Sequence, residues 1–160
     1  MDFPVELLRE ISRKIQKRNE KIAVAESVTS GFLQFLFSQM ENASTFFSGG
    51  ITAYNLEQKV NLLNVDRETA VQTNCVSPLV SETMSKKVTE NFRSDWGIAI
   101  TGYATPVKES GFELYAYFSI HYQSRLMVSE KIRPENVKLP SEIQQFYSES
   151  ILKKLLELLT

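Results

Sequence analysis

The segment Ala-Val-Ala-Glu-Ser-Val-Thr-Ser-Gly, which begins at Ala23, is the feature that most constrains how this chain can fold. Residues 22–25 form an apolar run typical of a buried strand, and this run stops at a cluster of hydroxyl side chains followed by a glycine. Apolar residues then return at helical spacing, at Phe32, Leu33, Leu36 and Met40. We therefore predict a strand that passes through a turn at residues 26–31 into a helix.

Ser27 lies in this predicted turn, where two roles are open to it. Backbone N–H groups at the start of a helix lack partners, so the turn could bind a phosphate or an oxyanion and present Ser27 as a nucleophile. Serine is also among the commonest helix N-cap residues, and the local sequence by itself favours the capping role.

Helical and strand patterns alternate along the rest of the chain. We predict a first helix at residues 4–18, capped by Asp2, and a last one at residues 141–159. Three more helices are expected to begin after Asn55, Asp66 and Ser77. Further strands are predicted at residues 46–53, 96–101, 112–122 and 125–133, of which the last two form a hairpin.

This order of elements predicts an α/β protein with a three-layer α/β/α sandwich fold. The sheet is expected to have five strands, mixed but mainly parallel, and the fold to be a single domain over residues 1–160.

Composition excludes several classes of protein. The 18 Lys and Arg nearly balance the 19 Asp and Glu, so there is no basic field that would attract nucleic acid. No segment is long and apolar enough for a signal peptide or a membrane span. The single Cys75 cannot form an internal disulfide and suits a reducing compartment. We expect a cytoplasmic protein with neither a nucleic-acid nor a membrane partner.

Polar residues follow three of the predicted parallel strands, where ligands bind in open α/β sheets. These are Glu26-Ser27, Tyr54 and Thr101-Gly102. If Asn55 caps a helix, Lys59 lies in its second turn and points back toward Tyr54. A desolvated lysine can take the proton of a serine hydroxyl, and a tyrosine can relay it. On spacing alone, a solvated surface lysine remains the more common case.

His121 is the only histidine of the chain and lies within a predicted strand. The local pattern places no carboxylate beside it, so we interpret it as a partly buried residue without a catalytic role.

These motifs resemble the CinA C-terminal domain family, whose stand-alone bacterial members are nicotinamide mononucleotide (NMN) deamidases. The segment Ala-Glu-Ser-Val-Thr-Ser-Gly from Ala25 is similar to the family's Ala-Glu-Ser-Cys-Thr-Gly-Gly. Residues 47–55 followed by Lys59 are similar to its Phe-x-Gly-Gly-x-x-x-Tyr-Ser-Asn-x-x-Lys block, and Val76-Ser77 and residues 98–102 also fit.

The resemblance implies an amidohydrolase that converts NMN into nicotinate mononucleotide and ammonia, with Ser27, Tyr54 and Lys59 as its catalytic residues. Substrate-binding residues would be Glu26, Thr29, Ser30, Gly31, Gly49, Gly50, Asn55, Thr101 and Gly102. The substrate would be a small molecule, a pyridine nucleotide, and neither a metal nor another cofactor would be needed. We also expect a homo-oligomer.

The chain departs from the family pattern in two places. The family has a long Ala-Gly-Pro-x-Gly-Gly loop that ends in Pro-Val-Gly, whereas residues 103–111 form a shorter segment with one glycine. A Gly-Asp-Arg segment before the last helix is replaced by residues 136–140, which removes a candidate bidentate phosphate ligand. We therefore predict weaker NMN binding than in relatives that keep both features. The alternatives are a CinA-like binding or regulatory protein, or an interaction module whose pocket is no longer used.

Overall fold

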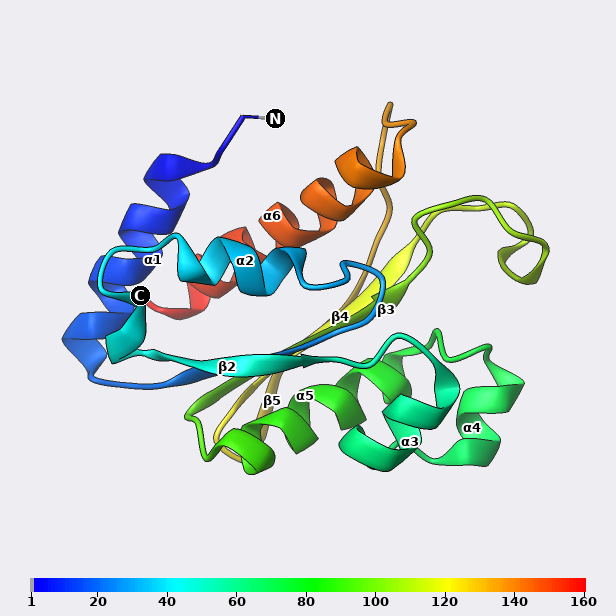
Figure 1. Cartoon of the computed structure of the whole chain (residues 1–160), viewed down its shortest axis with the longest axis horizontal. Helices are drawn as coiled ribbons and strands as arrows, with labels where there is room; N and C mark the ends of the chain where they lie inside the picture. Colours follow the sequence, from blue (N-terminus) through cyan, green and yellow to red (C-terminus); the bar gives the residue numbers. More distant parts are fainter. Residues whose placement is uncertain (1) are drawn as a thin grey trace.

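The computed structural model describes residues 2–160, and its centre is a five-stranded sheet (Figure 1). The strands are β1 (Ile22–Glu26), β2 (Phe47–Thr52), β3 (Trp96–Gly102), β4 (Ala116–Tyr122) and β5 (Arg125–Ile132). Their order in the sheet is β2-β1-β3-β4-β5. β1 pairs in parallel with both β2 and β3, whereas β4 pairs antiparallel with β3 and with β5. The predicted mixed sheet is confirmed, and β4 alone among these five strands runs against the others.

Helices cover both faces of the sheet, as the predicted α/β class requires (Figure 1). One face carries α1 (Val5–Arg18), α2 (Phe32–Ser38) and α6 (Pro140–Leu158). The other face carries α3 (Leu56–Leu63), α4 (Arg67–Gln72) and α5 (Pro78–Phe92). Short 3-10 helices lie at Ala43–Thr45 and Lys108–Ser110.

Residue size differs between the two faces of the central strands. Toward α1, α2 and α6, β1 and β3 present Ile22, Val24, Ile98 and Ile100. Toward α5 they present alanines, and at Gly97 no side chain at all. A Cβ at Gly97 would lie 1.8 Å from Thr89 Oγ1 and 2.3 Å from the Ser85 carbonyl oxygen. Small residues on this face therefore let α5 lie close against the sheet.

Helix starts follow the predicted caps in three cases and depart from them in one. Side-chain oxygens of Asn55, Asp66 and Ser77 accept backbone N–H groups at the starts of α3, α4 and α5. The predicted Asp2 cap is wrong, because α1 begins at Val5, its N-cap residue is Pro4, and no side chain makes a cap hydrogen bond. No helix within residues 2–160 combines the length and the apolar character needed to cross a membrane.

The hairpin of β4 and β5 turns at residues 123–124 as predicted, but β4 is shorter than the predicted strand. Residues 108–110 are helical, and Phe112 has a φ of +63°, which an extended strand does not allow. On the α5 face of β4, Nδ1 of buried His121 lies 2.7 Å from Ser85 Oγ. Burial lowers the pKa of His121, and the residue does not line the pocket described below.

Candidate active site

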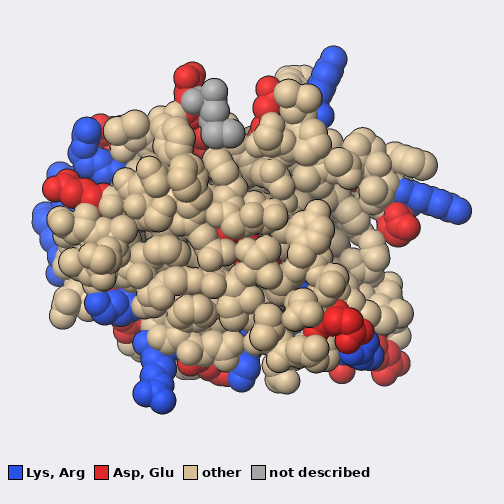
Figure 2. All heavy atoms as spheres, in the orientation of Figure 1, with Lys and Arg blue, Asp and Glu red and all other residues tan. Residues whose placement is uncertain are grey.

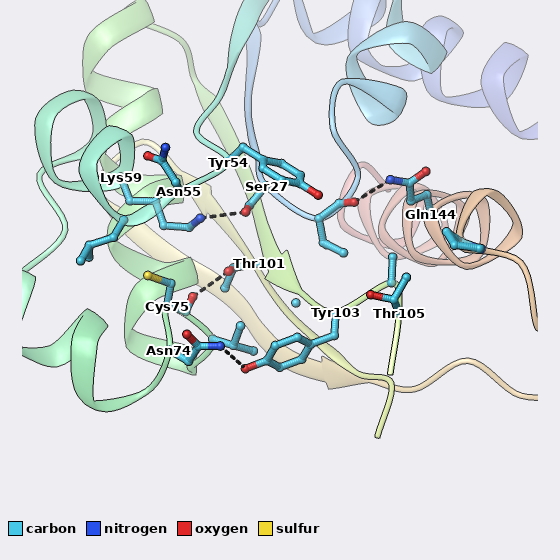
Figure 3. Close-up of a pocket in the computed structure, with 16 residues that line it drawn as sticks. Ser27, Tyr54, Asn55, Lys59, Asn74, Cys75, Thr101, Tyr103, Thr105 and Gln144 are labelled. Carbon is cyan, nitrogen blue, oxygen red and sulfur yellow. Dashed lines mark hydrogen bonds between the residues drawn. The ribbon is translucent and has the colours of Figure 1, made fainter. Parts of the chain in front are cut away.

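A pocket of about 410 Å³ lies at the carboxyl ends of the three parallel strands (Figure 3). Ser27 enters it from the end of β1, Tyr54 from just beyond β2, and Thr101 from β3. Asn55 and Lys59 line it from α3, and Gly102 from the last position of β3. The structure thus brings together all three predicted catalytic residues and three of the predicted substrate-binding residues.

Ser27 and Lys59 form a direct contact inside this pocket. The Nζ atom of Lys59 lies 2.7 Å from Ser27 Oγ and donates a second hydrogen bond, of 2.9 Å, to the Ala53 carbonyl oxygen. Both residues are buried, with 6% of Ser27 and 2% of Lys59 exposed. In Figure 3 the lysine side chain crosses from α3 toward the serine. The surface-lysine interpretation of Lys59 is therefore wrong, because the side chain is buried against the loop that carries Ser27.

Burial makes Lys59 a weaker base than an exposed lysine. Removal from water lowers the pKa of Lys59 below its ordinary value, because a buried ammonium loses its hydration. Among residues 2–160 no carboxylate forms a salt bridge with it. Lys59 therefore becomes neutral at a lower pH than a solvated lysine does, and a neutral amine is what a proton acceptor requires.

Glu26 holds the loop that presents Ser27. Its two carboxylate oxygens accept the N–H groups of Leu33 and Gln34, at 2.8 and 2.9 Å, and this satisfies the first turn of α2. Gly31, with a φ of +92°, is the N-cap residue of α2 and makes no side-chain cap hydrogen bond. The capping role considered for Ser27 is therefore wrong. Ser27 is left free to contact Lys59.

The loop is also held from the opposite side. Nε2 of Gln144, in α6, donates a 2.9 Å hydrogen bond to the carbonyl oxygen of Val28 (Figure 3). Ser27 therefore lies between two anchors, Glu26 before it and Val28 after it. This is the support that a catalytic side chain needs to keep its rotamer.

We predict that Glu26→Gln lowers the free energy of unfolding by about 1–3 kcal/mol. The glutamine amide has only one acceptor oxygen, so its NH₂ group faces one of the two helix N–H groups and cannot accept from it. The substitution also removes the negative charge that the helix dipole stabilises. The free energy comes from urea unfolding followed by circular dichroism. Glu6→Gln serves as the control, since the Glu6–Arg9 pair is exposed and its loss is expected to cost less than about 0.5 kcal/mol. Equal stability of Glu26→Gln and the unmodified chain would contradict the prediction.

Tyr54 lies at the rim of the pocket rather than within the serine–lysine pair. Its side chain is 68% exposed and lines the pocket. Its hydroxyl makes no hydrogen bond to Ser27 or Lys59, both of which lie in the described part of the chain. The proton relay considered for Tyr54 would therefore require the side chain to move, or a water to lie between them.

The wall opposite Tyr54 combines Thr101, which the sequence singled out, with Asn74, Cys75 and Tyr103, for which it predicted no role in the pocket. Thr101 Oγ1 donates a 2.7 Å hydrogen bond to the carbonyl oxygen of Cys75, and Asn74 Nδ2 donates one of 3.1 Å to the Tyr103 hydroxyl. Asn74 and Cys75 both have positive φ, at +51° and +62°. Burial raises the pKa of the Cys75 thiol, which keeps the thiol protonated. Two features of the sequence could have indicated this wall: the polar residues that follow Thr101-Gly102, and the asparagine that precedes Val76-Ser77.

Six predicted substrate-binding residues do not line the pocket. These are Glu26, Thr29, Ser30, Gly31, Gly49 and Gly50. The two glycines of β2 serve packing instead. A Cβ at Gly49 would lie 3.1 Å from the Phe92 ring, and one at Gly50 would lie 2.5 Å from the Val24 carbonyl oxygen. Their lack of a side chain lets β2 lie against its neighbours.

The fold and the pocket define a class of protein, namely α/β domains that hold a buried serine–lysine pair at the carboxyl edge of a mixed sheet. The particular family is shown by its sequence model. The chain belongs to the CinA family, because the model described as the CinA C-terminal domain matches residues 5–136.

Curated relatives agree with this assignment. "Protein MG115" of Mycoplasma genitalium is 40% identical over 94 residues, which are 59% of this chain and 60% of that protein. A "CinA-like protein" of Thermosynechococcus vestitus is 40% identical over 96 residues, which are 60% of this chain and 23% of that protein. The matches thus span less than two thirds of these relatives' own lengths, 60% in the first and 23% in the second.

Solved structures show the same fold at lower identity. The CinA superfamily protein KP700603 from Klebsiella pneumoniae has a TM-score of 0.90 at 24% identity, with 96% of each chain covered. A competence or damage-inducible protein from Enterobacter asburiae has a TM-score of 0.92 at 22% identity, with 100% of each chain covered.

Proposed function

We propose that this chain is an amidohydrolase that cleaves a carboxamide, with Ser27 as nucleophile and Lys59 as general base. The observation that carries the proposal is the 2.7 Å contact between a buried lysine amine and a serine hydroxyl inside a pocket. Family membership adds NMN as the carboxamide that the resemblance implies.

The arrangement can carry out acyl transfer in two steps. Neutral Lys59 takes the proton of the Ser27 hydroxyl while Ser27 Oγ bonds to the carboxamide carbon. The resulting ammonium returns the proton to the departing nitrogen, the C–N bond breaks, and ammonia leaves an acyl ester on Ser27. A water then attacks this ester and gives a proton to Lys59. The ammonium passes this proton to Ser27 Oγ as the ester bond breaks, which releases the carboxylic acid and restores the serine hydroxyl and the neutral amine.

The negative oxygen of each tetrahedral intermediate needs N–H donors. The Ser30 N–H donates to the Ser27 carbonyl oxygen, the Phe32 N–H donates to the Thr29 carbonyl oxygen, and the next two N–H groups of α2 donate to Glu26. The backbone N–H groups of Val28 and Thr29, directly after the nucleophile, are therefore our candidates for the oxyanion site.

Ammonia release is the test of this function. The chain is incubated with NMN and with a panel of other aromatic and aliphatic carboxamides, and Ser27→Ala serves as the blank. Ammonia formed by the unmodified chain and not by Ser27→Ala supports the proposal. Tight binding of a carboxamide without ammonia release would instead support a binding or regulatory relative.

For Tyr54→Phe we predict an intact fold and a partial loss of rate, roughly three- to tenfold, as expected for one hydrogen bond of about 0.5–1.5 kcal/mol. The exposed hydroxyl makes no bond within the serine–lysine pair, so the pair remains in place without it. Steady-state kinetics on an accepted carboxamide measure the loss. A loss as large as that of Ser27→Ala would instead place Tyr54 at the centre of the proton transfer.

A further inference from the structure

The pocket contains very little charge. Among the described residues that line it, Lys59 is the only Lys, Arg, His, Asp or Glu. Its amine already contacts Ser27 and the Ala53 carbonyl oxygen, and burial lowers its pKa. The side chains that line the pocket therefore offer no full positive charge that is free to bind an anion. On the face of the molecule that Figure 2 draws, most charged side chains lie around the edge.

The rest of the wall is polar, uncharged and partly aromatic. Asn55, Asn74 and Gln144 line the pocket, and two tyrosines, Tyr54 and Tyr103, face it (Figure 3). Tyr103 is held at its hydroxyl, which accepts from Asn74, and at its backbone. Its N–H donates to the Tyr115 carbonyl oxygen, and its carbonyl oxygen accepts from the Tyr147 hydroxyl. A tyrosine face binds planar rings and attracts positive charge through its quadrupole.

These two observations lead to a substrate class. Phosphate is normally held by charge-assisted hydrogen bonds from arginine or lysine, and a dianion without such partners loses hydration on entering a pocket. A neutral or cationic ring that carries a carboxamide loses less hydration on entering the pocket, and it gains contact with the tyrosines. On the basis of the function proposed above, we propose that the substrate is an aromatic carboxamide that carries no phosphate group, and that the pocket selects against its phosphorylated form.

Nicotinamide riboside and NMN provide a matched pair of probes, since they differ only in the phosphate group. We expect kcat/KM of the unmodified chain to be at least about tenfold higher for the riboside than for NMN. Calorimetric titration of both compounds measures the same selection without turnover, and we expect the riboside to bind at least about tenfold more tightly.

A variant adds the charge that the pocket lacks. Thr105 lines the pocket and is exposed, so Thr105→Arg places a guanidinium there without replacing a buried residue. Thr105→Met is the matched control of similar length without charge. We expect Thr105→Arg to shift the ratio of NMN to riboside affinity by tenfold or more toward NMN, and Thr105→Met to leave this ratio within about twofold.

The outcomes separate this inference from the proposed function. Equal or tighter binding of NMN by the unmodified chain overturns the inference, whether or not ammonia is released. Failure of the riboside to bind overturns it as well. Binding that favours the riboside without ammonia release supports the selection against phosphate and counts against the amidohydrolase. Ammonia release that strongly favours NMN supports the amidohydrolase and overturns the inference.

Discussion

Replacing Ser27 by alanine is expected to lower kcat/KM for an accepted carboxamide by about 1,000-fold or more, and Lys59→Ala by a similar factor. Each residue supplies half of one chemical unit, because the hydroxyl is a weak nucleophile without a proton acceptor and the amine has no role without the hydroxyl. The double variant should be little worse than either single one, since residues that act as a unit are strongly non-additive. Steady-state measurement of ammonia release gives all four values.

The control for this cycle addresses folding. Ser27 is small, so its alanine variant should keep the unfolding midpoint of the unmodified chain, whereas Lys59→Ala leaves a cavity and should be compared with Lys59→Met, which fills it. We expect Lys59→Met to fold and to be as inactive as Lys59→Ala. If Ser27→Ala hydrolyses a carboxamide at the unmodified rate, Ser27 is not the nucleophile. If the losses simply multiply in the double variant, the two residues do not act as a pair.

The order of strands and helices could be predicted because apolar residues recur at a different spacing in a helix than in a strand. The strand β1 and its turn into α2 were visible in one segment of the sequence, and so were the caps at Asn55, Asp66 and Ser77. The segment before β4 was not predictable. Its alternating residues are typical of a strand, yet Phe112 has a positive φ, which excludes it from a strand, and β4 starts at Ala116.

The serine–lysine pair was predicted from the family resemblance, although its members lie 32 positions apart and spacing alone favoured a surface lysine. Parallel strands end at one edge of a sheet, and a capped helix returns its second turn to that edge, so the topology brings the two side chains together. The roles of Glu26 and Gln144 could not be predicted in this way. Glu26 reaches amides seven and eight positions later, and Gln144 reaches a carbonyl 116 positions earlier. These contacts depend on how α2 and α6 pack, and no local pattern in the sequence indicates that packing.

The packing of Glu26 also affects the electrostatics of the base. A carboxylate beside Lys59 would have raised the pKa of the amine and kept it charged. In the structure both oxygens of Glu26 face the N–H groups of α2, and burial of Lys59 is the dominant effect on its pKa, which is lowered from 10.5. A thiolate at Cys75 would act in the opposite direction, but burial raises the pKa of that thiol and keeps it neutral.

Activity should therefore rise with pH and level off below the ordinary lysine value. The base works only when Lys59 is neutral, so below its pKa the rate should increase about tenfold for each pH unit, and above it the rate should become constant. The logarithm of kcat/KM measured across pH 6 to 10, which spans about four units, tests this slope, since kcat/KM reports the free enzyme. Cys75→Ala removes the thiol and should move the midpoint little, whereas Lys59→Arg keeps a permanent positive charge and should be inactive throughout. A rate that is flat over this range, or that falls as pH rises, would mean that Lys59 acts as a charged group and that the proton of Ser27 goes elsewhere.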